Sequence, residues 1–292
     1  MPASFQATER TSVHDAEIHG IDALEIPIEP HPSRRARLWR ATWPVVAAIV
    51  LFLALWEVVV RLGFWPGYAL PGPRTVIARL VDQRGVLLRA AGVTMTRAAI
   101  GYAVAFVVGS VAGLVVVGNR AIRTAVASMI TGLQTMPSIV WFPLTILLLG
   151  LTENAILAVI ILGAAPSIAN GLIVAVDQIP PVLVSAGKVL GAKRVAMYRH
   201  VLLPAALPSF VGGMKQGWSF AWRSLMAGEI IVSLGQRQSL GLLMHNNQAV
   251  SDVTGLLAAM IVVFAIGVLV DRLVFTRLER SIQTRWGLLG SL

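Results

Sequence analysis

The chain has 292 residues, of which 56% are hydrophobic and 13% are charged, and it contains no cysteine. A soluble domain carries roughly 25% charged residues, so this composition leaves too little polar surface for a water-soluble protein of this size. It also excludes a disordered chain, a collagen and a disulfide scaffold. The net charge of +10 comes mainly from residues between long apolar runs, which favours a membrane protein over a nucleic-acid partner.

Residues 1–40 are polar and lack the apolar core of a secretory signal, so we expect a disordered cytosolic tail. Apolar runs follow at 45–60, 98–119, 124–152, 154–176, 207–232 and 253–270. A membrane-spanning helix needs about 20 apolar residues. The fifth run is long enough, but it contains charged residues whose place in a membrane has to be explained. The sequence therefore predicts an all-α polytopic membrane protein, with six transmembrane helices in a 41–280 domain and a cytosolic tail over 281–292.

The third run is too long for one straight span. A helix over 124–152 would reach roughly 43 Å, against about 30 Å of hydrocarbon. We predict a break at Met136, Pro137 and Ser138. Irregular backbone at membrane depth survives only beside protein or a water-filled cavity, so the break indicates either a translocation path or a proline kink absorbed by packing.

Lys and Arg residues set the predicted orientation. With both termini inside, the inner flanks carry about twice as many basic residues as the outer flanks, which favours an N-in, C-in topology. The weak point is the basic segment 61–97, which this topology assigns to the outside. Its Arg residues recur at helical spacing, so it is interpreted as an amphipathic helix at the membrane surface.

The longest inner loop, 177–206, is predicted to contain two short helices. Gly191 provides the turn between them, and Pro204 is expected to end the second helix. Their apolar faces need a cover, which is either a partner protein or the inner ends of the spans.

Three charged residues lie on the fifth run. At about 100° per residue, Glu229 and Lys215 share one stripe with Trp218, Trp222 and Met226, while Arg223 points roughly 80° away. Lys215 and Glu229 are about 21 Å apart, so they cannot pair with each other. Each side chain must pair with another helix, face a water-filled path or extend to the membrane–water interface.

No constellation for catalysis or metal binding is predicted, so the chain is not expected to be an enzyme. The string from Ser185 to Val189 contains Gly-Lys but lacks the upstream glycine and the following Ser or Thr of a P-loop. None of the five histidines is paired at metal-ligand spacing.

Four separated strings together resemble one family: LPGPRTV (70–76), LQTMPSIVWFPLTILLLGL (133–151), GAKRVAMYRHVLLPAALP (191–208) and WRSLMAGE (222–229). They look like the permease subunit of type I ABC importers, in the branch for sulfonates, nitrate, taurine or bicarbonate. The resemblance covers about 41–288 and implies the type I (MetI-like) permease fold. The competing class, a stand-alone secondary transporter or channel, would require internal repeats and coupling acids, and neither is evident.

The resemblance implies that the 177–206 loop couples this chain to an ATPase. Ala186, Gly191, Leu203 and Pro204 match the family's loop pattern, whereas Ser185 replaces its glutamate and Gly187 its second alanine. The implied coupling residues are Ser185, Ala186, Gly187, Gly191, Arg199, His200, Leu203 and Pro204. The candidate path residues are Met136, Pro137, Ser138, Trp141, Trp222, Arg223 and Glu229.

The implied partners are a second permease copy, two ABC ATPases that hold ATP and Mg²⁺, a substrate-binding protein or lipoprotein, and the lipid bilayer of the cytoplasmic (inner) membrane. No cofactor is expected in this chain. The family branch indicates a small anion as substrate, with aliphatic sulfonate ahead of nitrate, taurine and bicarbonate.

Overall fold

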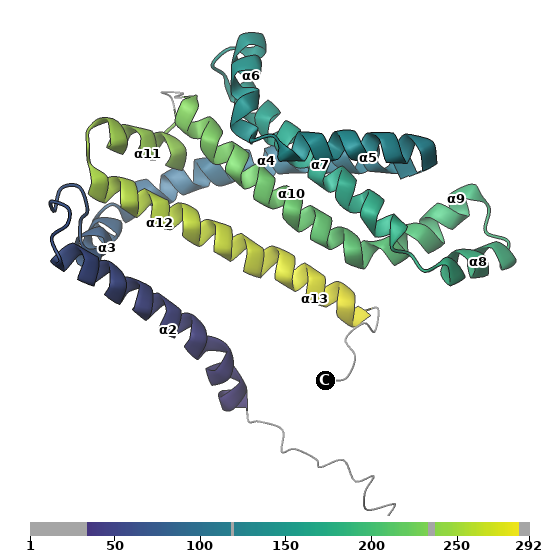
Figure 1. The fold of residues 1–292 in the computed structure, drawn as a ribbon, viewed down its shortest axis with the longest axis horizontal. Helices are drawn as coiled ribbons and strands as arrows, with labels where there is room; N and C mark the ends of the chain where they lie inside the picture. The colour runs from purple at the N-terminus through teal and green to yellow at the C-terminus, as the bar shows by residue number, and fades with distance from the viewer. Residues whose placement is uncertain (1–33, 118–119, 233–236, 286–292) are drawn as a thin grey trace, which may run out of the picture. The chain divides into compact units, whose positions relative to one another are not determined.

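The computed structural model describes residues 34–117, 120–232 and 237–285. Every regular element within these ranges is a helix (Figure 1). The chain divides into two units, Met1–Val58 and Val59–Leu292, which are taken separately. The predicted N-terminal tail lies outside the described residues as far as residue 33, and residues 286–292 of the predicted C-terminal tail lie outside them as well.

Residues 34–58 of helix α2 (Arg34–Arg61) make up the described part of the first unit. The helix begins inside the predicted tail, because its first residues are Arg, Ala and Leu, which favour helix. Its Thr42–Arg61 part is long and apolar enough to cross a membrane.

The core of the second unit is built from three long helices: α4 (Arg84–Val117), α7 (Glu153–Asp177) and α10 (Leu203–Ile231). Glycines allow them to approach closely. Gly171 of α7 and Gly213 of α10 meet backbone to backbone, and a Cβ on either would overlap the Cα of the other. Gly109 of α4 packs in the same way against the Ala165 carbonyl of α7. Because α7 touches both neighbours, it is the central and most buried of the three.

The third apolar run is broken, as predicted. Helix α5 (Arg120–Thr135) ends before Pro137, and a 3-10 turn η1 (Ser138–Trp141) leads into α6 (Phe142–Leu149). The two arms are bent by 95°. Pro137 lacks an amide N–H and takes an extended conformation, with ψ at 131°, which prevents the α5 helix from continuing.

The second span begins earlier than predicted. Helix α4 starts at Arg84, so the surface helix expected over 61–97 is confined to α3 (Pro73–Asp82). The prediction was wrong because Arg97 was taken as a boundary, whereas it is a buried residue with carboxylate partners.

The last elements are α11 (Leu240–Ala249), α12 (Val253–Val270), the π-helical turn η3 (Asp271–Phe275) and α13 (Thr276–Arg285). Helix α12 has the bounds of the sixth apolar run, with Asp252 as its N-cap. Helix α13 extends into the predicted C-terminal tail, since η3 carries the helix past Asp271 without a break.

Four helices of the described chain are long and apolar enough to cross a membrane, and the bent α5–α6 pair would make a fifth. Helix α10 is outside this set and carries Lys215, Arg223 and Glu229. The count of six spans and the N-in, C-in orientation stay predictions.

Candidate coupling and translocation sites

The loop between α7 and α10 folds as two short helices joined by a glycine turn. Helix α8 (Pro181–Val189) is followed by Gly191, whose φ of +76° lies in the left-handed region. The Ala192 amide donates to the Gly187 carbonyl at 3.0 Å, which closes the turn. The chain then enters α9 (Arg194–Met197). Both short helices and the glycine turn were predicted.

Pro204 does not end the second helix. Helix α9 continues through a π-helical turn, η2 (Tyr198–Leu202), directly into α10, and Pro204 occupies the first turn of α10. The prediction was wrong because the wider turn lets the Leu203 amide bond to the Tyr198 carbonyl. The missing N–H of Pro204 is therefore accommodated where the bonding pattern changes.

The tips of this loop are apolar and exposed. Val189 and Leu190 at the end of α8 are 88% and 86% exposed, and Val195 on α9 is 78% exposed. Ser185 and Ala186 lie on the exposed surface of α8, whereas Gly187 is buried against Met197 and Val201. Within the protomer, the inner ends of the spans therefore do not cover Val189, Leu190 and Val195. The alternative that the whole loop packs on those ends is wrong for these residues.

A basic groove of about 670 Å³ lies beside the apolar tips. It is lined by Lys193, Val195, Ala196, Arg199 and His200. Arg199 and His200 are exposed, and His200 Nδ1 lies 3.2 Å from the Ala196 carbonyl. Leu203 and Pro204 are partly exposed where α10 begins. The surface thus offers apolar contacts next to positive charge.

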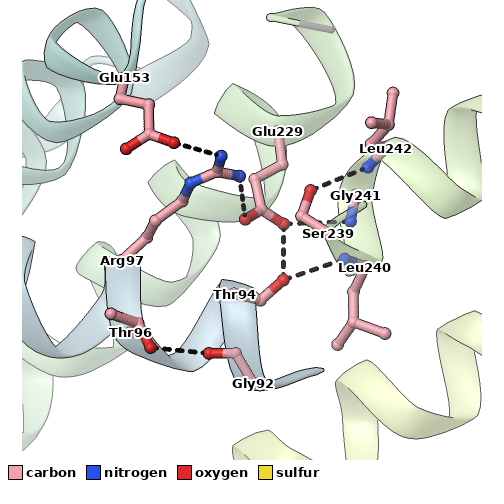
Figure 2. Close-up of polar contacts among 10 residues, drawn as sticks. All are labelled: Gly92, Thr94, Thr96, Arg97, Glu153, Glu229, Ser239, Leu240, Gly241 and Leu242. Carbon is pink, nitrogen blue, oxygen red and sulfur yellow. Dashed lines mark hydrogen bonds and ion pairs between the residues drawn. The ribbon is translucent and has the colours of Figure 1, made fainter. Parts of the chain in front are cut away.

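Glu229 is the centre of a buried polar network (Figure 2). Its side chain is 1% exposed, and its Oε1 lies 3.0 Å from Nη1 of Arg97. Its Oε2 accepts from Thr94 at 2.9 Å and from the Gly241 amide at 3.1 Å. The other terminal nitrogen of Arg97 donates to Glu153 at 2.9 Å. The network therefore joins α4, α7, α10 and the start of α11 through a fully partnered ion pair.

Lys215 also has its partner on another element. Its Nζ lies 2.9 Å from Oδ1 of Asp271, the first residue of η3. Trp218, one turn further along α10, stacks on Trp222 at 6.0 Å and meets Tyr102 edge to face at 5.4 Å. The stripe predicted on the fifth run is thus mainly a packing face. Helical spacing alone could not pair residues that lie so far apart in the chain.

The remaining path candidates divide between exposed and partly buried positions. Met136 and Pro137 are exposed at the bend, and Ser138 and Trp141 of η1 are half-buried. Arg223 is exposed, its Nε donates to the Ser219 carbonyl at 3.0 Å, and its guanidinium lies 4.7 Å from the Phe220 ring centre. These candidates thus lie at the α5–α6 bend and along α10, with different degrees of exposure.

The sequence interpretation missed a second stripe on α10. Its members are exposed, and all but one are polar: Ser209, Gly212, Gln216, Ser219 and Arg223. We call these residues the polar stripe. They recur at alternating steps of three and four, so they share one face of the helix. This spacing is visible in the sequence, but the aromatic stripe beside it carried the stronger pattern.

A comparison with known protein families decides which kind of protein this is. Residues 105–284 match the family described as "Binding-protein-dependent transport system inner membrane component". The chain belongs to this family. It is therefore a multi-pass inner-membrane permease subunit of an ABC importer, as the sequence predicted.

Characterised relatives transport different compounds. The chain is 24% identical to the nitrate import permease protein NrtB of Synechocystis sp., over 79% of this chain and 86% of that protein. It is 25% identical to the taurine transport system permease protein TauC of Escherichia coli, over 69% and 77% of the two chains. It is 28% identical to the riboflavin transport system permease protein RibX of Chloroflexus aurantiacus, over 78% and 85%.

A solved structure supports the fold. The inward-facing MetNI methionine ABC transporter contains a chain that superposes with a TM-score of 0.59 and 21% sequence identity, covering 69% of this chain and 98% of that one. The type I importer permease fold predicted from the sequence is confirmed.

Proposed function

We propose that this permease carries a small anion, with an aliphatic sulfonate as the first candidate and nitrate, taurine or bicarbonate as the next. The nitrate and taurine permeases among its relatives support an anionic substrate, whereas the riboflavin permease does not. Arg223 is exposed on α10 and has no carboxylate partner among the described residues, so it is the feature that agrees with a negative charge on the substrate.

The transporter is proposed to contain two copies of this chain, two ABC ATPases that hold ATP and Mg²⁺, and a substrate-binding protein or lipoprotein. This chain contributes neither nucleotide nor metal ligands. The exposed apolar tips of the 177–206 loop are the observation that carries this assignment, because Val189, Leu190 and Val195 need a partner to cover them.

The coupling contact is assigned to the surface around Gly191. Ser185 and Ala186 of α8 would meet the ATPase through neutral contacts, because no carboxylate stands at Ser185 to pair with an arginine. Arg199 and His200 would supply the charged part of the contact, and Gly187, Leu203 and Pro204 would hold its shape. The path itself is assigned to Met136, Pro137, Ser138, Trp141, Trp222 and Arg223, while Glu229 would support it from behind.

The test is ATP hydrolysis in lipid. The chain is co-expressed with a candidate ABC ATPase, and binding proteins loaded with a sulfonate, taurine or nitrate are added in turn. We expect one loaded protein to stimulate hydrolysis more than its empty form does. If no ATPase co-purifies, or if every loaded protein leaves hydrolysis unchanged, the proposal fails and a stand-alone transporter becomes the better description.

A further inference from the structure

The polar stripe of α10 is exposed on the outside of the protomer. Ser209, Gln216, Ser219 and Arg223 are exposed along a helix of 29 residues, which spans about 43 Å. An arginine and a glutamine are poorly solvated by lipid, so a stripe of this kind faces a bundle interior or a water-filled cavity. The exposed face of α10 therefore differs from that of α12, where Phe264 is 72% exposed.

Charge pairing distinguishes Arg223 from Arg97 and Lys215. Arg97 is paired with Glu229 and Glu153, and Lys215 is paired with Asp271. Among the described residues, no carboxylate lies within ion-pair distance of Arg223, whose recorded contacts are the Ser219 carbonyl and the Phe220 ring. Arg223 thus retains an uncompensated positive charge.

The side chain of Arg223 does not extend toward the nearer end of the helix. Arg223 lies about 12 Å from the C-terminal end of α10 and about 30 Å from its start. Its guanidinium bends back over Phe220 toward the N-terminal half, so it points to the middle of the helix and away from the nearer surface.

From these three observations we infer that Arg223 is the charge partner of an oxyanion, such as a sulfonate, in a water-filled path along the polar stripe. This inference rests on the proposed function and identifies the residue that contacts its substrate. If two copies pair with the stripes facing each other, the two stripes contribute two arginines and no acid to the space between them. Such a space would favour an anion.

The test uses the natural absence of cysteine. Ser219→Cys places one thiol a single turn from Arg223, and Phe264→Cys is the control on the apolar face of α12. The full-length chain in membrane vesicles is labelled with two methanethiosulfonates, one bearing an anionic sulfonate and one a cationic trimethylammonium. Each labelling rate is divided by the rate of the same reagent with a small free thiol.

We expect the cysteine at 219 to react, and to prefer the sulfonate reagent by about tenfold after this correction, because an uncompensated cation concentrates anions locally. Adding Arg223→Gln should abolish the preference, and Arg223→Lys should keep most of it. The double variant K215Q/D271N removes the ion pair between α10 and η3 without changing the net charge, and it should leave the preference unchanged. The cysteine at 264 should react with neither reagent.

Two results would overturn the inference. If the cysteine at 219 is as unreactive as the one at 264, the stripe does not face water. If the sulfonate preference is absent, or survives Arg223→Gln, Arg223 does not attract the anion. Both outcomes are independent of the ATPase test, since labelling needs neither ATP hydrolysis nor a binding protein, so failure of either proposal is recognised separately.

Discussion

Single residues decide where charge is tolerated in this bundle. Glu229 and Arg97 are almost completely buried, and each satisfies the other through direct contact. A buried pair adds little net stability, but removing one partner leaves an uncompensated charge. From the sequence, Glu229 could either line a path or pack between helices. Its buried network joins α4, α7, α10 and α11, and this arrangement favours packing.

Replacing Glu229 with Ala should therefore reduce the amount of folded protein. The loss of folding free energy is expected to be about 3–5 kcal/mol, because Arg97 would stay buried with only Glu153 as a partner. Thermal unfolding of the purified protein in detergent measures the effect. Glu153→Gln is the matched control, since its side chain is 53% exposed and its loss should cost much less. Equal melting temperatures for the two variants would contradict this explanation.

At the scale of helices, α7 and α10 are in direct backbone contact. Gly213→Ala adds a methyl group where the backbone of Gly171 already lies, so the helices must separate. Overpacking typically costs 1–3 kcal/mol, and we expect at least about that loss here. The neighbouring Gly212→Ala is the control, because nothing lies within 4 Å of its Cβ position. Melting temperature again provides the measurement, and similar values for both variants would disprove the close contact.

The coupling loop offers a second test at this scale. Gly191→Pro should abolish uptake, because proline fixes φ near −65° where the loop requires +76°, and because it removes the amide that bonds to the Lys188 carbonyl. Gly63→Pro makes the same change at a φ of +71° outside the loop, where the Gly63 amide bonds to the Val60 carbonyl. Uptake should fail only in the first variant. Normal uptake by Gly191→Pro would remove the coupling assignment.

Much of the element pattern was predictable from the sequence, for local reasons. The break at Pro137, the turn at Gly191 and the bounds of α12 follow from proline, glycine and hydropathy within a few residues. The start of α4 and the role of Glu229 were not predictable in this way. Both depend on an ion pair between Arg97 and Glu229, which are 132 positions apart and meet only after the helices pack.

At the scale of the whole molecule, the basic residues predict how the chain is oriented in the membrane. The excess of basic residues predicts that the coupling loop is inside and α11 outside. Leu190→Cys on the loop tip should be labelled by a membrane-impermeant thiol reagent only from the cytosolic side. His245→Cys, on the exposed surface of α11, should be labelled only from the opposite side. Labelling of both from one side would refute the predicted topology.

The glycine contact between α7 and α10 has a mechanical consequence. Two helices that are in backbone contact cannot slide past each other without separating. We therefore expect α7 and α10 to move as one rigid body. The 177–206 loop joins the two helices at one end of this pair, and α6 and α11 lie toward the other end (Figure 1). A displacement of the loop is therefore expected to move the far ends of both helices together.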